Sequence, residues 1–179
     1  MFTKKQVDLR NHFRMLWEQH AVWTWSTIIS LVFGLPITDS VVARLLRNPV
    51  DFERALQPYY GGRIAAAFRD LLREHLVLAA DLVIAAKAGN NEAAAEVERK
   101  WYTNADAIAV FLGRINPFWS KEQWRMMMRR HLDLVKAQAV NMLTGNYETS
   151  IAAYDENEMH ILTMADVMAE GIIKQFHIY

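Results

Sequence analysis

Long stretches of apolar and helix-forming residues fill this chain, and they are separated by short groups of Gly, Pro, Asn and Ser. Only seven Gly and four Pro occur in 179 residues, so the pattern predicts a few long helices rather than strands. The stops and caps place helices at residues 4–33, 38–47, 92–113, 120–145 and 147–176, and another that follows a turn at residues 58–62 and runs to residue 87, with a further helical piece at residues 51–56.

The expected fold is therefore all-α, an up-down helical bundle of about six helices. No flexible linker, charge block or low-complexity segment interrupts residues 1–179, which predicts a single helical-bundle domain. We expect three helical hairpins, at approximately residues 4–57, 61–113 and 120–176, related by an internal repeat of about 55 residues.

The repeat rests on one eight-residue pattern that occurs three times, at 13–20, 68–75 and 124–131: an aromatic residue, Arg, any residue, two apolar residues, two polar residues and His. The final histidines are His20, His75 and His131, which are 55 and 56 residues apart. Apolar residues three, four and seven positions away share their helical faces, so all three rings should point into the core. A buried imidazole needs partners, because an unpaired polar group costs about 1–3 kcal/mol.

Two interpretations of these histidines stay open. The second helices carry a weaker echo of the repeat, in Asn48, Asn104 and Asn157, and polar groups on facing helices would satisfy histidines that are merely structural. Alternatively, the three rings converge on a transition metal such as Fe, Zn or Mn, since three imidazoles with an open position form a known catalytic metal set.

Four further residues would supplement such a metal site: His160, Glu18, Asp106 and Asp166. The sequence lacks the Glu-x-x-His motif that carboxylate-bridged di-iron bundles use, and none of the three repeated histidines has a Glu four residues later. The nine Met and six Trp are expected to be core residues.

The amino-acid composition excludes several other classes of function. Without Cys there is no disulfide scaffold, thiolate metal site or Cys nucleophile, and 20 basic residues against 20 acidic ones leave no electrostatic footprint for nucleic acid. The longest apolar run, at residues 21–36, is too short to span a bilayer and lacks the features of a signal peptide. We therefore expect a cytoplasmic protein without nucleic-acid or membrane partners.

Five segments carry a resemblance: residues 16–20, 45–52, 101–106, 115–119 and 164–166, which read LWEQH, LLRNPVDF, WYTNAD, INPFW and MAD. Over its full length the chain resembles small helical proteins of Bacillus- and Clostridium-type bacteria without an established function, some of them labelled acetylglutamate kinase. Such a kinase needs an α/β fold with a glycine-rich nucleotide site, so the resemblance implies no kinase activity here. A looser similarity to ferritin-like and hemerythrin-like bundles implies the same architecture.

The function that we expect from the sequence is metal binding in a ferritin-like or hemerythrin-like bundle, with a redox or oxygen-related role. The alternative is a non-catalytic binding or interaction protein, which could form a homodimer, with structural histidines. A metal-free enzyme would instead need a pocket in which one histidine approaches Asp106 or Asp155.

Overall fold

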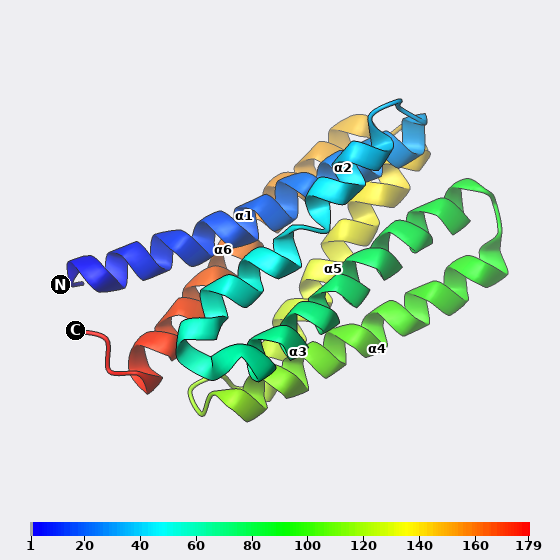
Figure 1. The fold of residues 1–179 in the computed structure, drawn as a ribbon. Coiled ribbons are helices and arrows are strands. Elements are labelled where there is room, and N and C mark those ends of the chain that lie inside the picture. Colours follow the sequence, from blue (N-terminus) through cyan, green and yellow to red (C-terminus); the bar gives the residue numbers. More distant parts are fainter. Residues whose placement is uncertain (1) are drawn as a thin grey trace.

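Six helices account for nearly all of the chain in a computed structural model that describes residues 2–179 (Figure 1). They are α1 (Lys4–Phe33), α2 (Thr38–Leu45), α3 (Asn48–Lys87), α4 (Asn91–Ile115), α5 (Lys121–Leu143) and α6 (Tyr147–Gln175). Residues 2–179 contain no strand. The all-α class predicted from the sequence is confirmed, and the six helices agree with the expected number.

Local signals explain where the helices begin and end. The Ser120 hydroxyl accepts a hydrogen bond from the Gln123 amide at 3.2 Å and opens α5, and the Asn90 side chain does the same for the Ala93 amide at the start of α4. Gly34 ends α1 in the left-handed conformation, with φ of 62°. Such side-chain caps satisfy amides that the first helical turn leaves without partners.

The region between α1 and α4 differs from the sequence-based expectation: α2 ends at Leu45 instead of residue 47, and the helical pieces expected on both sides of the turn form one helix, α3, which begins at Asn48. The turn expected at residues 58–62 is a kink inside α3, because only Gly61 leaves the helical region, with φ of 78° and ψ of 162°. The predicted cap of α2 at residues 38–40 is also wrong: Ile37 precedes the helix without a side-chain cap. The Thr38 hydroxyl is occupied elsewhere, since it donates to the carbonyl of Leu35 at 2.6 Å.

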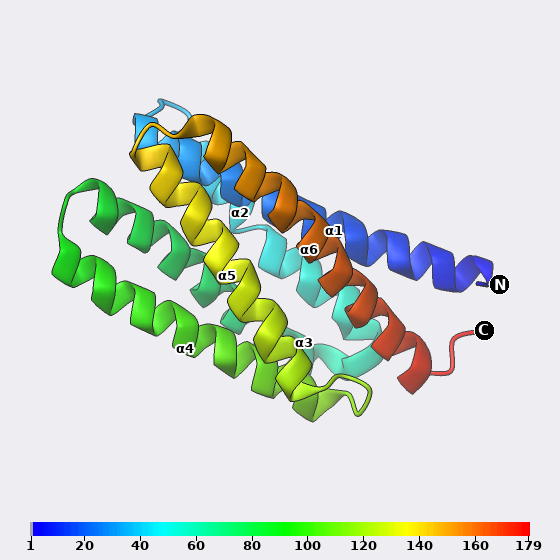
Figure 2. The ribbon, with the colours of Figure 1, turned by 180° about the vertical axis from the view of Figure 1, so that it is seen from behind.

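The five long helices form a closed ring. Going around it, α1 packs on α6, α6 on α5, α5 on α4, α4 on α3, and α3 on α1, while α1 also touches α5 across the interior. Both views show α1 and α6 side by side and the two chain ends at the same end of the bundle (Figures 1 and 2). The short α2 lies against α1 near the opposite end.

The core of the ring is dominated by large side chains that are fully buried, including Trp17, Trp101 and Trp124. Within residues 2–179, no helix is both long enough and apolar enough to cross a membrane. The internal repeat stays a prediction, because the first expected unit contains the short α2 and the start of α3, whereas the other two units each consist mainly of two long helices.

Candidate metal centre

Three histidines from three helices meet in the middle of the bundle. His20 lies on α1, His75 on α3 and His131 on α5, and each is about 1% exposed. Their ring centroids are 6.3 Å apart for His20 and His75, 6.1 Å for His75 and His131, and 5.4 Å for His20 and His131. One ring nitrogen from each lies within 4.8 Å of the other two. The convergence follows from the packing of α1 against both α3 and α5.

Each ring is held by an asparagine from a neighbouring helix. The contacts join His20 Nδ1 to Asn48 Oδ1 at 3.2 Å, His75 Nδ1 to Asn104 Oδ1 at 3.0 Å, and His131 Nδ1 to Asn157 Oδ1 at 2.8 Å. All three asparagines are at least nine-tenths buried. The cluster is therefore an arrangement of three equivalent His–Asn pairs, and these asparagines are the polar partners that the sequence pattern predicted on the second helices.

The hydrogen bonds of the asparagines determine which ring nitrogen carries the proton. Asn48 Nδ2 donates to the carbonyl of Leu16 at 2.9 Å, one helical turn before His20. A carbonyl only accepts, so the amide nitrogen must face Leu16 and the amide oxygen must face the ring. His20 Nδ1 is then the protonated nitrogen, and Nε2 carries a free lone pair.

The second pair repeats this arrangement. Asn104 Nδ2 donates to the carbonyl of Leu71 at 3.2 Å and to the carboxylate of Glu74 at 2.9 Å. His75 Nδ1 therefore donates to Asn104, and His75 Nε2 is buried without a hydrogen-bond partner among residues 2–179. A buried acceptor without a partner has a desolvation cost of about 1–3 kcal/mol, which a ligand at this nitrogen would offset.

The three imidazoles are neutral at physiological pH. Burial lowers the pKa of His20, His75 and His131 to about 3 in each case, because a charged ring would lose its hydration. Each ring also opposes protonation of a neighbour, His75 acting on His20, His131 on His75 and His20 on His131. A neutral imidazole with a free Nε2 lone pair is the form that binds transition metals.

Indole rings surround the cluster. The Trp17 ring lies 5.4 Å from His20, the Trp101 ring lies 5.5 Å from His75, and Trp17 stacks on Trp124 at 6.4 Å. The Nε1 atoms of these three tryptophans are buried without partners within the described part of the chain. The indole rings are apolar and exclude solvent-exposed surface from the cluster, whereas their N–H groups add three buried donors beside it.

The four supplementary ligands predicted from the sequence lie outside this cluster, which is the one potential metal-binding group found within residues 2–179. His160 is half-buried, and its Nε2 donates to the carbonyl of Met127 at 2.8 Å. Glu18 is half-buried near Glu158, and its pKa is raised by burial and by repulsion from that second carboxyl group. Neither side chain joins the three imidazoles.

The two aspartates are bound by arginines. Asp106 pairs with Arg129 at 2.7 Å and with Arg125 at 3.3 Å, and the hydrogen bond from Arg129 is the main reason that the pKa of Asp106 is lowered. Asp166 accepts two hydrogen bonds from Arg14, at 2.8 and 2.7 Å. These two carboxylates form ion pairs between helices and are not part of the histidine cluster.

Sequence reasoning placed the asparagines in the core but did not assign them to the site. The signal was available, because the separation of 29 residues between His75 and Asn104 is close to the 28 of the first pair and the 26 of the third. The indole shell carried no comparable signal, since tryptophans occur in most cores.

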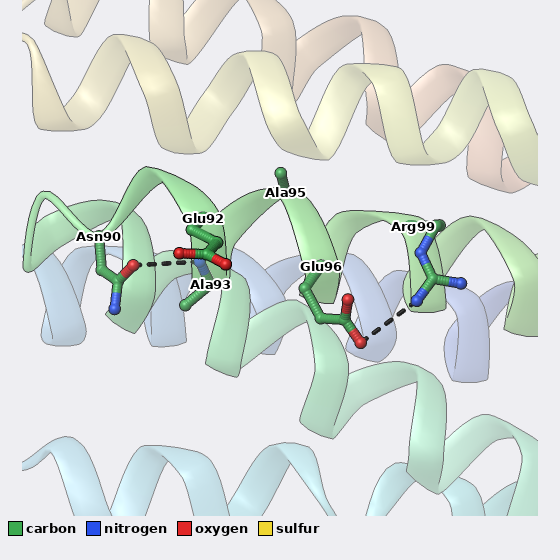
Figure 3. A pocket seen from close by; sticks show the side chains of 6 residues that line it. All are labelled: Asn90, Glu92, Ala93, Ala95, Glu96 and Arg99. Atoms are coloured by element: carbon green, nitrogen blue, oxygen red, sulfur yellow. Dashed lines mark hydrogen bonds and ion pairs between the residues drawn. The ribbon is translucent and has the colours of Figure 1, made fainter.

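The surface hollow at the start of α4 is a weaker candidate for a ligand site than the histidine cluster. A hollow of about 620 Å³ lies at the start of α4 (Figure 3). Its lining residues are Asn90, Glu92, Ala93, Ala95, Glu96 and Arg99. All six come from one short segment, and Glu96 is already paired with Arg99 at 3.2 Å, so no groups from different helices converge there. A ligand site needs such convergence, and the histidine cluster has it.

Comparison with models of known protein families, with curated proteins and with solved structures gives no match to this chain. The resemblance to small helical proteins of Bacillus- and Clostridium-type bacteria therefore stays a prediction. The class defined by fold and site is a helical bundle with three Asn-supported histidines in its core, and the function has to be argued from that geometry.

Proposed function

We propose that this protein binds one transition-metal ion through the Nε2 atoms of His20, His75 and His131. The observation that carries the proposal is the convergence of three neutral imidazoles, each with one ring nitrogen within 4.8 Å of the other two, while Nδ1 of each ring is engaged by an asparagine. Metal-bound histidines commonly donate their second ring N–H to a carbonyl or carboxylate, which fixes tautomer and orientation.

The proposed centre differs from those of ferritin-like proteins. A di-iron bundle uses several carboxylates that project inward, whereas the present group consists of histidines alone. We therefore propose a mononuclear site in a bundle that shares only its helical architecture with that class. Three protein ligands leave a coordination position open, as in catalytic rather than structural metal sites, and this supports a role in redox or small-molecule chemistry.

A second candidate function has one observation in its favour. Every Nδ1 atom already has a hydrogen-bond partner, which is what a structural His–Asn network requires. In that case the bundle acts through its surface, as a binding or interaction protein. The two candidates differ in the role of the Nε2 atoms, which need no external ligand if the network is only structural.

The test is elemental analysis of untagged protein, purified without chelator and compared with two variants. We expect about one equivalent of metal in the wild type, its loss in His75→Gln, and its retention in the matched control His12→Gln, whose side chain is exposed. Since His75→Gln could also unfold the core, far-UV circular dichroism accompanies each sample. Metal-free wild type that gains no thermal stability from Zn(II), Co(II), Cu(I) or Fe(II) would refute the proposal.

A further inference from the structure

The residues that hold the three imidazoles are neutral. Metal sites often place a carboxylate behind each histidine, and that negative charge balances the charge of the ion. Here the same position is occupied three times by an asparagine amide: Asn48, Asn104 and Asn157. The group that would coordinate the ion and the group behind it therefore carry no formal charge.

The nearest carboxylates do little to change this. Glu74 bonds to Asn104, but it is exposed on the surface, where water screens its charge. Glu18 precedes His20 by two residues on α1, so the two side chains point to different faces of the helix, and Glu18 is not part of the histidine group. Asp106 and Asp166 are neutralised by arginines. Among residues 2–179 no Asp or Glu is buried, so no buried anion compensates an ion at the centre.

Burial makes the charge of the ion decisive. The cost of moving an ion from water into an apolar interior grows with the square of its charge, so a divalent ion costs about four times as much as a univalent one of equal size. The three histidines are each about 1% exposed, so solvent cannot reduce this difference. A divalent ion would need to bring an anion with it.

On the basis of the metal-binding function proposed above, we infer that the site selects a univalent ion with a filled d shell, Cu(I) in the cell, over divalent ions. Cu(I) is stable with three nitrogen ligands, whereas Zn(II) normally completes a set of four. Imidazole is a suitable ligand for copper. The three rings, at centroid separations of 5.4–6.3 Å, offer three nitrogens and no carboxylate.

The experiment uses two pairs of ions that have the same electron configuration and differ in charge: Cu(I) with Zn(II), and Ag(I) with Cd(II). Dissociation constants are measured for the full-length apo-protein by competition with chelators, under anaerobic conditions for Cu(I) and without chloride for Ag(I). We expect one equivalent of each univalent ion, bound more tightly than its divalent counterpart. Imidazole itself favours univalent ions, so a variant must isolate the effect of charge.

Asn157→Asp supplies that variant. It replaces the amide behind His131 by a carboxylate of nearly the same shape, and the Asn157 oxygen that accepts from the ring is retained. Coulomb energy is proportional to charge, so if affinity for the univalent ion rises about tenfold, affinity for the divalent ion should rise about a hundredfold. Asn90→Asp, at the exposed cap of α4, is the control and should change neither affinity.

The outcomes distinguish metal binding itself from selectivity for univalent ions. Failure of all four ions to bind to the wild type, together with no gain in thermal stability from Co(II) or Fe(II), would refute the metal-binding function itself. Binding of Zn(II) or Cd(II) as tightly as the univalent partner would leave metal binding intact and overturn the selectivity. An equal gain for both charges in Asn157→Asp would also overturn it, because the neutral surroundings would then not be the cause.

Discussion

Acid should unfold the metal-free protein through its three core histidines. In the unfolded chain these rings have an ordinary pKa of 6.5, while in the folded protein their pKa is lowered to about 3. Between these values the unfolded state binds more protons than the folded state, so the free energy of unfolding decreases as the pH falls. Well above pH 6.5 the three rings are neutral in both states, and their contribution no longer changes.

The size of the effect follows from the number of rings. Each proton bound only by the unfolded state changes stability by about 1.4 kcal/mol per pH unit, so three rings give about 4 kcal/mol per pH unit well below pH 6.5. A domain with a total stability of about 5–15 kcal/mol would lose it within a few pH units. The raised pKa of Glu18 acts in the opposite direction, since protonation of this residue favours the folded state.

The assay is urea unfolding followed by circular dichroism at closely spaced pH values from 8 to 5. The slope of unfolding free energy against pH counts the protons taken up on unfolding, and we expect it to approach three near pH 5. In His75→Gln the count should fall to about two, because one titrating ring has been removed. A slope near zero in the wild type, or an unchanged slope in the variant, would refute the neutral, buried state of the cluster.

Three further predictions test other parts of the structure. In Gly171→Ala the new Cβ would lie 1.9 Å from Nε1 of the buried Trp119, so thermal unfolding should show a loss of about 3 kcal/mol or more, and a near-neutral result would contradict the close packing. Gly61→Ala should cost about 1–3 kcal/mol in urea unfolding, since Gly61 adopts φ of 78° and ψ of 162°. Gly62→Ala, next to it, meets only Gln57 at 3.7 Å and should be tolerated, so equal losses would rule out backbone strain. Asp106→Asn should change stability by about 1 kcal/mol or less and leave bound metal unchanged; loss of metal would return this residue to the site.

The helices could be predicted from the sequence because their ends are local features. Ser120, Asn90 and Gly34 act on their own turns, and no distant contact is needed to recognise them. Gly61 is different: glycine next to a proline-containing segment signals a break, but whether the chain reverses or continues depends on what the next turns pack against. The kink inside α3 is therefore a tertiary outcome.

The site could be predicted only in part, for a related reason. Neighbouring residues in the sequence show that His20, His75 and His131 lie on the apolar faces of their helices, so their burial could be predicted. Whether the three rings meet depends on how α1, α3 and α5 cross in space. For Asp106 and Asp166, no sequence feature distinguished a carboxylate in the core from one bound to arginines 19 or more residues away in the chain. Their ion pairs form between helices, and only the three-dimensional arrangement determines them.

The burial of the three imidazoles also determines how fast a bound ion exchanges with solvent. With each ring about 1% exposed, an ion reaches or leaves the Nε2 atoms only when α1, α3 and α5 separate, and such openings are rare in a well-packed core. Exchange of the ion would then proceed at the opening rate of the bundle, independent of chelator concentration. Loading of the metal-free protein and competition with chelators would therefore reach equilibrium only after many such openings.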